Sequence, residues 1–195
     1  MKILVACEES GTVTQAFRSK GHDAWSCDLL PTSGPFPQYH LQQDVIGVLD
    51  QDWDMVVAFP PCDHLAASGA RWFKQKQEDG RQPKAIEFFL QFTSLTTPKV
   101  VIENPVGIMS TVYRRPDQII QPFYFGHEAR KTTCLWLKGV PPLLPTSIVG
   151  QGELVTLPDG TTFPKWISNA NPRTRKVLRS KTFQGVATAM AEQWG

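Results

Sequence analysis

The sequence predicts one three-layer α/β domain, in which helices cover both faces of a mostly parallel sheet. Short apolar runs alternate with stretches whose apolar residues recur at helical spacing, which is the pattern of repeated strand, helix and strand units. A chain of 195 residues with 41% hydrophobic content is large enough for one such core and too short for a second full domain.

The first part of the chain predicts a strand, a helix and further strands. An apolar run opens the chain, and the following helix is closed by Gly21. This strand, helix and strand opening is typical of a Rossmann-like fold. The elements are a strand at residues 2–6, a helix with Val13, Ala16 and Phe17 on one face, and strands at residues 24–27 and 55–59.

The rest of the chain continues this alternation and then departs from it. Residues 139–172 contain six prolines, with Pro158-Asp159-Gly160 as a turn signal between short β-prone runs. We therefore expect a core at residues 1–138, an irregular insertion at residues 139–172, and a basic segment plus a helix that packs back on the core at residues 173–195. The expected elements are a helix introduced near Pro83 with Ile86, Phe89 and Leu90 on its apolar face, a strand at residues 99–102, and a final helix with Phe183, Val186, Ala187, Met190 and Trp194 on one face.

Composition excludes several classes of protein. The four cysteines show no CxxC spacing, so neither a disulfide framework nor a zinc site is indicated, and the chain is expected to be cytoplasmic. No stretch is long enough to span a membrane, and no obligate protein partner is evident. A net charge of +2 permits binding to nucleic acid without requiring it. The basic residues Arg173, Arg175, Lys176, Arg179 and Lys181 form either a solvated helix flank or a phosphate-contacting surface.

Residues that follow the predicted strands indicate a ligand site, because ligands of open α/β sheets bind beyond the carboxyl ends of the strands. The turn Cys7-Glu8-Glu9-Ser10-Gly11 has one glycine where a diphosphate ligand would require GxGxxG. S-adenosylmethionine has no phosphate and carries a cation, so the acidic turn is compatible with it. Asp28 can accept hydrogen bonds from ribose hydroxyls and Asp44 from an adenine amino group, although both are also typical turn or cap residues.

Two further strand ends carry groups suited to covalent catalysis. Phe59-Pro60-Pro61-Cys62 holds a thiol in a stiff loop at the mouth of the sheet, whereas a lone cysteine is more often a small buried hydrophobe. Glu103-Asn104 ends another apolar run, and a buried glutamate there can be protonated and donate to a ring nitrogen. The alternative for Glu103 is a structural salt bridge or a cap.

On these residues the sequence resembles the DNA cytosine-5 methyltransferase family over most of its length. Pro60-Pro61-Cys62 with Ser68-Gly69 resembles the catalytic loop PCQ-x-FS-x-x-G, and Glu103-Asn104 with Val106 resembles the ENV element. Residues 10–28 and Asp44 resemble the cofactor-binding opening, and residues 185–191 resemble the closing helix. The chain is similar to small members encoded by bacteriophages, with a much reduced target-recognition region at residues 139–172.

The resemblance implies transfer of a methyl group from S-adenosylmethionine to carbon 5 of cytosine in DNA. Cys62 would add to carbon 6 of the base while Glu103 binds ring nitrogen 3. Gly126 to Lys131 only approximates the family's Gln-x-Arg-x-Arg element, with Arg130 as its main basic group, and Asp63 replaces a common glutamine. The implied cofactor-binding residues are Glu9, Ser10, Gly11, Asp28, Asp44 and Pro60, and the implied substrate-binding residues are Pro61, Ser68, Asn104 and Lys131.

Two alternatives remain open. The same chemistry on single-stranded nucleic acid or on a free cytidine nucleotide would need neither duplex recognition nor base flipping, which fits the short insertion. A catalytically inactive protein that binds nucleic acid is the second alternative, because Cys7-Glu8-Glu9 replaces the phenylalanine and glycines of the family's first motif.

Overall fold

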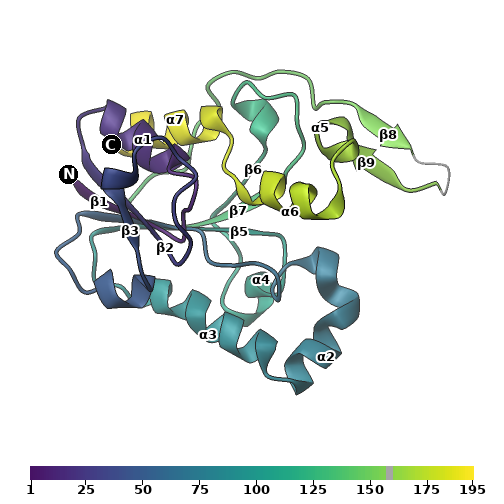
Figure 1. The fold of residues 1–195 in the computed structure, drawn as a ribbon, viewed down its shortest axis with the longest axis horizontal. Coiled ribbons are helices and arrows are strands. Elements are labelled where there is room, and N and C mark those ends of the chain that lie inside the picture. Colours follow the sequence, from purple (N-terminus) through teal and green to yellow (C-terminus); the bar gives the residue numbers. More distant parts are fainter. Residues whose placement is uncertain (157–159) are drawn as a thin grey trace.

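The computed structural model describes residues 1–156 and 160–195, and it contains a seven-stranded sheet between two layers of helices (Figure 1). The strand order is β3-β2-β1-β4-β5-β7-β6, with β1 to β5 parallel and β7 antiparallel to both of its neighbours. This is the Rossmann-like α/β fold of methyltransferases, as the sequence predicted. The strands are β1 (Lys2–Ala6), β2 (Asp23–Asp28), β3 (His40–Gln42), β4 (Met55–Ala58), β5 (Lys99–Pro105), β6 (Gln118–Ile120) and β7 (Thr133–Lys138).

Helices and short turns connect these strands. The helices are α1 (Thr12–Ser19), α2 (Phe73–Glu78), α3 (Arg81–Thr93), α4 (Met109–Val112), α5 (Lys165–Ser168), α6 (Pro172–Ser180) and α7 (Gln184–Trp194). Short 3-10 helices are η1 (Pro37–Tyr39), η2 (Val45–Val48), η3 (Ala67–Trp72) and η4 (Pro122–Tyr124).

The central strands are apolar because both faces of the sheet are covered. All four residues of β4 are buried, and β4 pairs in parallel register with β1 (Ile3 opposite Met55) and with β5 (Ala58 opposite Ile102). As a consequence, the carboxyl ends of these three strands lie next to one another at one edge of the sheet.

Each face of the sheet has its own hydrophobic core. Helices α1 and α7 pack against each other and cover one face, whereas α3 covers the other (Figure 1). Four of the five residues predicted on the apolar face of the last helix are buried in it, namely Val186, Ala187, Met190 and Trp194. Phe183 lies just before α7 and is half-buried against the same core. In α3 the buried aromatic residues are Phe89 and Phe92. Ile86 and Leu90, predicted on the same face as Phe89, are only half-buried because they line a groove between α3 and α4.

The proline-rich segment forms a small hairpin rather than an extension of the sheet. Strands β8 (Leu154–Thr156) and β9 (Thr162–Pro164) pair antiparallel, with Thr156 opposite Thr162, and α5 follows directly. The expected turn lies partly outside the described residues, because Pro158 and Asp159 belong to that part of the chain. Among residues 1–156 and 160–195, no helix is both long and apolar enough to cross a bilayer.

Candidate active site

The loop after β4 and the end of β5 are joined by hydrogen bonds. Asn104 is 1% exposed, and its Nδ2 donates to the carbonyl of Pro60 at 2.7 Å. The Ala67 amide donates to the Val106 carbonyl at 2.8 Å, and the Ile108 amide donates to the Leu65 carbonyl at 2.9 Å. These contacts fix the loop that carries the predicted nucleophile against the strand that carries the predicted carboxylate.

Gly107 makes this close approach possible. A Cβ atom at Gly107 would collide with the carbonyl group of Leu65, so a side chain there would push the two loops apart. On the far side of the loop, the buried Gln82 of α3 donates from Nε2 to the His64 carbonyl at 3.0 Å. The loop is therefore held both before and after Cys62.

The thiol of Cys62 is half-buried beside charged groups. The carbonyl of Cys62 accepts hydrogen bonds from the amides of Leu65 and Ala66, both at 3.0 Å, which closes a tight turn. Burial raises the pKa of the Cys62 thiol, and the charges of Glu103 and Asp63 raise it further, whereas Lys131 lowers it. Cys62 and Glu103 follow neighbouring positions of the sheet, because β4 and β5 pair in parallel with Ala58 opposite Ile102.

Glu103 and Lys131 form a largely buried ion pair. Their Oε1 and Nζ atoms are 3.7 Å apart, and the side chains are 13% and 21% exposed. Burial raises the pKa of Glu103, while Lys131 opposes that rise. Lys131 Nζ also donates to the Lys181 carbonyl at 3.2 Å. A cavity of about 10 Å³, enough for one water molecule, adjoins this pair and Phe183.

The structure brings Lys131, rather than Arg130, to Glu103. Arg130 is exposed, and its Nε donates to the Gln151 carbonyl at 3.4 Å, towards the proline-rich segment. Adjacent residues of an extended chain point in opposite directions, so only one of the two basic side chains can reach the carboxylate.

The other predicted substrate-binding residues differ in their exposure. Pro61 and Ser68 are exposed on the loop between β4 and α2, where an incoming molecule can reach them. Asn104, in contrast, is buried beneath the loop and its amide is used by the Pro60 carbonyl. The contacts of Asn104 therefore suit a residue that positions Cys62.

On the opposite side of β4, the ends of β1 and β2 and the start of η2 lie together. Burial raises the pKa of Cys7, and the charges of Asp28 and Asp44 raise it further. Cys7 has φ 59°, a left-handed conformation that glycine adopts most easily. Cys7 thus adopts, in the turn after β1, a backbone conformation for which a glycine would be expected.

Asp28 and Asp44 each use one carboxylate oxygen locally. Asp28 Oδ1 accepts from the Leu30 amide at 2.9 Å, and Asp44 Oδ1 caps η2 by accepting from the Ile46 amide at 3.0 Å. Within the described ranges, neither Oδ2 atom has a hydrogen-bond partner. Both residues therefore serve as turn formers and still offer an acceptor to hydroxyl or amino groups of a ligand.

Glu8 has a structural role that the sequence did not reveal. Its buried carboxylate accepts from the amides of Val13 and Thr14 at 2.6 and 3.1 Å and from the Thr14 hydroxyl at 2.7 Å. Burial raises the pKa of Glu8 in spite of these hydrogen bonds. The first amides of α1 are thus satisfied by an internal anion, which disfavours a phosphate at this helix end.

The rest of the turn after β1 stays accessible. Glu9, Ser10 and Gly11 are partly exposed, and the Glu9 carbonyl accepts from the Thr32 hydroxyl at 2.7 Å. A hollow of about 240 Å³ borders Gly11 and Thr32. Pro60, the remaining predicted cofactor-binding residue, is buried at the end of β4.

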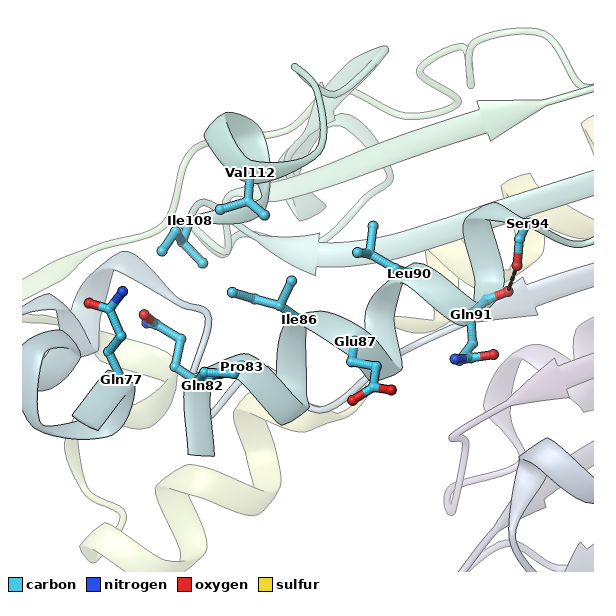
Figure 2. Close-up of a pocket in the computed structure, with 10 residues that line it drawn as sticks. All are labelled: Gln77, Gln82, Pro83, Ile86, Glu87, Leu90, Gln91, Ser94, Ile108 and Val112. Atoms are coloured by element: carbon cyan, nitrogen blue, oxygen red, sulfur yellow. Dashed lines mark hydrogen bonds between the residues drawn. The ribbon is translucent and has the colours of Figure 1, made fainter. Parts of the chain in front are cut away.

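A larger groove of about 600 Å³ lies away from these residues, between α3 and α4 (Figure 2). Figure 2 shows Ile86 and Leu90 of α3 facing Ile108 and Val112 across it. None of the predicted site residues lines this groove, so it is not part of the candidate active site.

Comparisons with known proteins agree with the fold. No protein-family model matches the sequence, and no curated protein matches it. One solved structure with a similar fold is the crystal structure of a protein assigned as a DNA modification methyltransferase, encoded within an E. coli prophage. The two structures have a TM-score of 0.51 and 16% sequence identity, over 76% of this chain and 51% of the other. This chain therefore spans about half of that protein's length and is similar to it in fold.

Proposed function

We propose that this protein transfers a methyl group from S-adenosylmethionine to carbon 5 of cytosine in DNA. The observation that carries the proposal is that Cys62 follows β4 while Glu103, paired with Lys131, lies at the end of the adjacent strand β5. The Asn104 hydrogen bond to the Pro60 carbonyl joins the two strand ends. The similar fold of a protein assigned as a DNA modification methyltransferase supports the choice of DNA as substrate.

The cofactor would lie over the ends of β1 and β2. The unpaired oxygens of Asp28 and Asp44 suit the ribose and adenine groups, and Glu9, Ser10 and Gly11 border the same side, next to Pro60. The occupied amides of α1 fit a ligand without phosphate. Bound there, S-adenosylmethionine supplies an electrophilic methyl group.

Cys62 and Glu103 would activate the cytosine ring from two sides. The Cys62 thiolate forms a bond to carbon 6. Burial raises the pKa of Glu103 and Lys131 opposes that rise, so Glu103 takes up a proton and hydrogen-bonds ring nitrogen 3 once the base takes the place of Lys131 at the carboxylate. Electron density then moves to carbon 5, which becomes nucleophilic. After methylation, loss of the carbon 5 proton and of the Cys62 sulfur restores the ring double bond and frees the enzyme.

Lys131 and Asn104 support this chemistry in different ways. Lys131 is the cation that lowers the pKa of Cys62, so it favours the thiolate. Asn104 holds the Pro60 carbonyl and thereby orients the loop, which reduces the entropy lost in reaching the attack geometry. With duplex DNA, the base must leave the stack, and the exposed residues Pro61 and Ser68 would contact it.

A methyl-transfer assay with radiolabelled cofactor tests the proposal. Duplex DNA, single-stranded DNA and cytidine nucleotides are each tested as substrates of the wild-type protein, of Cys62→Ala and of the control Cys134→Ala. The control removes the buried thiol of β7, the strand next to β5. We expect label on duplex DNA, its loss in Cys62→Ala with unchanged thermal stability, and its retention in the control. Label on single strands or nucleotides alone would show that duplex DNA is not the substrate. Binding to DNA without transfer of label to any substrate would show that the protein is a DNA-binding protein and not an enzyme of this kind.

A further inference from the structure

The basic run at the end of the chain divides into two sets in the structure. Arg175 lies 4.6 Å from the centre of the Phe163 ring and donates to the Ala170 carbonyl at 2.9 Å, so it fastens α6 to the hairpin segment. Lys181 donates to the Ser33 hydroxyl at 3.2 Å. Arg173, Lys176 and Arg179 are all exposed instead.

The three exposed residues share one face of α6. Lys176 and Arg179 follow Arg173 by three and six residues, so at 100° per residue the three side chains lie within an arc of about 120°. Arg173 and Arg179 are about 9 Å apart along the helix axis. Neither arginine has a side-chain partner within the described residues. No described side chain of α6 is buried, so packing does not explain why the helix presents these charges.

This basic face adjoins the loop of the proposed nucleophile. Lys176 Nζ lies 2.9 Å from Asp63 Oδ2, and Lys76 Nζ of α2 donates to the Asp63 carbonyl at 2.6 Å. Asp63 directly follows Cys62, so α6 and α2, which lie on the two sides of the sheet (Figure 1), both contact the residue next to Cys62. The same loop exposes half of the Trp72 side chain, with Arg71 above its ring.

We propose that the face formed by Arg173, Lys176 and Arg179 binds the phosphate backbone of DNA and that a phosphate group displaces Asp63 from Lys176. The exchange is feasible because both side chains of this ion pair are more than half exposed, and exposed ion pairs contribute little to stability. The inference rests on the proposed function for the identity of the polyanion.

Nucleic acid fits this surface better than an anionic membrane does. The cations surround a loop with a nucleophile, and an exposed tryptophan with a neighbouring arginine provides a stacking surface for a base. A membrane-binding helix would combine its charges with a wide apolar face buried in lipid. Among the described side chains of α6, only Val177 and Leu178 are large exposed apolar residues.

Salt dependence of DNA binding tests the proposal without cofactor or turnover. Binding to a fluorescent 20-base-pair duplex is measured by anisotropy from low to high salt for wild type, for Arg173→Gln/Arg179→Gln, and for the control Lys84→Gln/Arg115→Gln. The control removes two exposed positive charges that have no side-chain partners in the described part of the chain. Each lost phosphate contact flattens the slope of log K against log salt by about 0.9.

We expect a slope flatter by about 1.8 for the α6 variant and an unchanged slope for the control. Equal slopes in all three proteins, or equal flattening in both variants, would overturn the inference even if methyl transfer is active. Binding of wild type to phosphatidylserine vesicles, with no binding to DNA, would replace nucleic acid by a membrane surface. Because the readout is binding alone, an absence of methyl transfer would refute the proposed function and leave this result intact.

Discussion

Replacing Asn104 by alanine removes the contact that positions Cys62 and leaves the thiol itself in place. The Asn104 side chain is buried and donates to the Pro60 carbonyl, two residues before the nucleophile. In Asn104→Ala the Pro60 carbonyl loses its hydrogen-bond donor while it remains buried. The variant therefore separates the orientation of the nucleophile from its chemistry.

The expected loss of stability follows from the cost of an unsatisfied buried acceptor, which is about 1–3 kcal/mol. For a protein of this size, each kcal/mol lowers Tm by about 2–4 °C, so we expect a decrease of about 2–12 °C. A misplacement of the reacting group by about 1 Å reduces catalysis on the order of 100-fold. We therefore expect a loss of methyl transfer of that order at temperatures where the variant remains folded.

Thermal unfolding and methyl transfer are measured on the same samples, with Gln118→Ala as the control. Gln118 exchanges two hydrogen bonds of 2.7 Å with the backbone of Leu143, away from the loop, so its removal also costs stability. Only Asn104→Ala should lose methyl transfer beyond the fraction unfolded. Equal activity of the two folded variants would refute a positioning role for Asn104.

Three further predictions concern the charged groups. The charge of Glu103 raises the Cys62 pKa and that of Lys131 lowers it, so the pH midpoint of Cys62 alkylation by iodoacetamide should move downwards in Glu103→Gln and upwards in Lys131→Met. An unchanged midpoint in both variants would show that neither charge acts on the thiol. Burial raises the folded-state pKa of Glu8, so the stability that Glu8 contributes is present below its unfolded pKa and is lost as pH rises through the folded value. In urea unfolding, the free energy of unfolding of Glu8→Gln should therefore decrease less with rising pH than that of the wild type, and identical pH profiles would contradict this. Asp28→Ala should weaken cofactor binding by about 1–3 kcal/mol in calorimetry, with Asp52→Ala unchanged, whereas equal affinities would remove Asp28 from the site.

The central strands could be predicted from the sequence because parallel strands covered on both faces are continuous apolar runs, as in β1 and β4. The position of β7 between β5 and β6 could not, because the order of strands in space is not a local property of the chain. The packing of α3 is also set by the elements around it. Phe92 is buried with Phe89, whereas Ile86 and Leu90, which have the same helical spacing, are only half-buried.

In the candidate site, the strand ends were predictable and the paths of the side chains were not. The order of elements placed Cys62 and Glu103 at neighbouring strand ends. One residue of register decided between Arg130 and Lys131, because alternate residues of extended backbone face opposite sides. The capping role of Glu8 depends on the path of a turn, and its only sequence signal is a carboxylate five residues before Val13.

The central claim is that Cys62 attacks a cytosine held by Glu103, and covalent trapping tests it most directly. A duplex with 5-fluorocytosine cannot lose a proton from carbon 5, so the enzyme should remain attached to the base after methyl transfer. Incubation with cofactor, protease digestion and mass spectrometry should identify one adduct, on the peptide that contains Cys62. An adduct on another residue, or methylated duplex DNA without any trapped protein, would contradict the account.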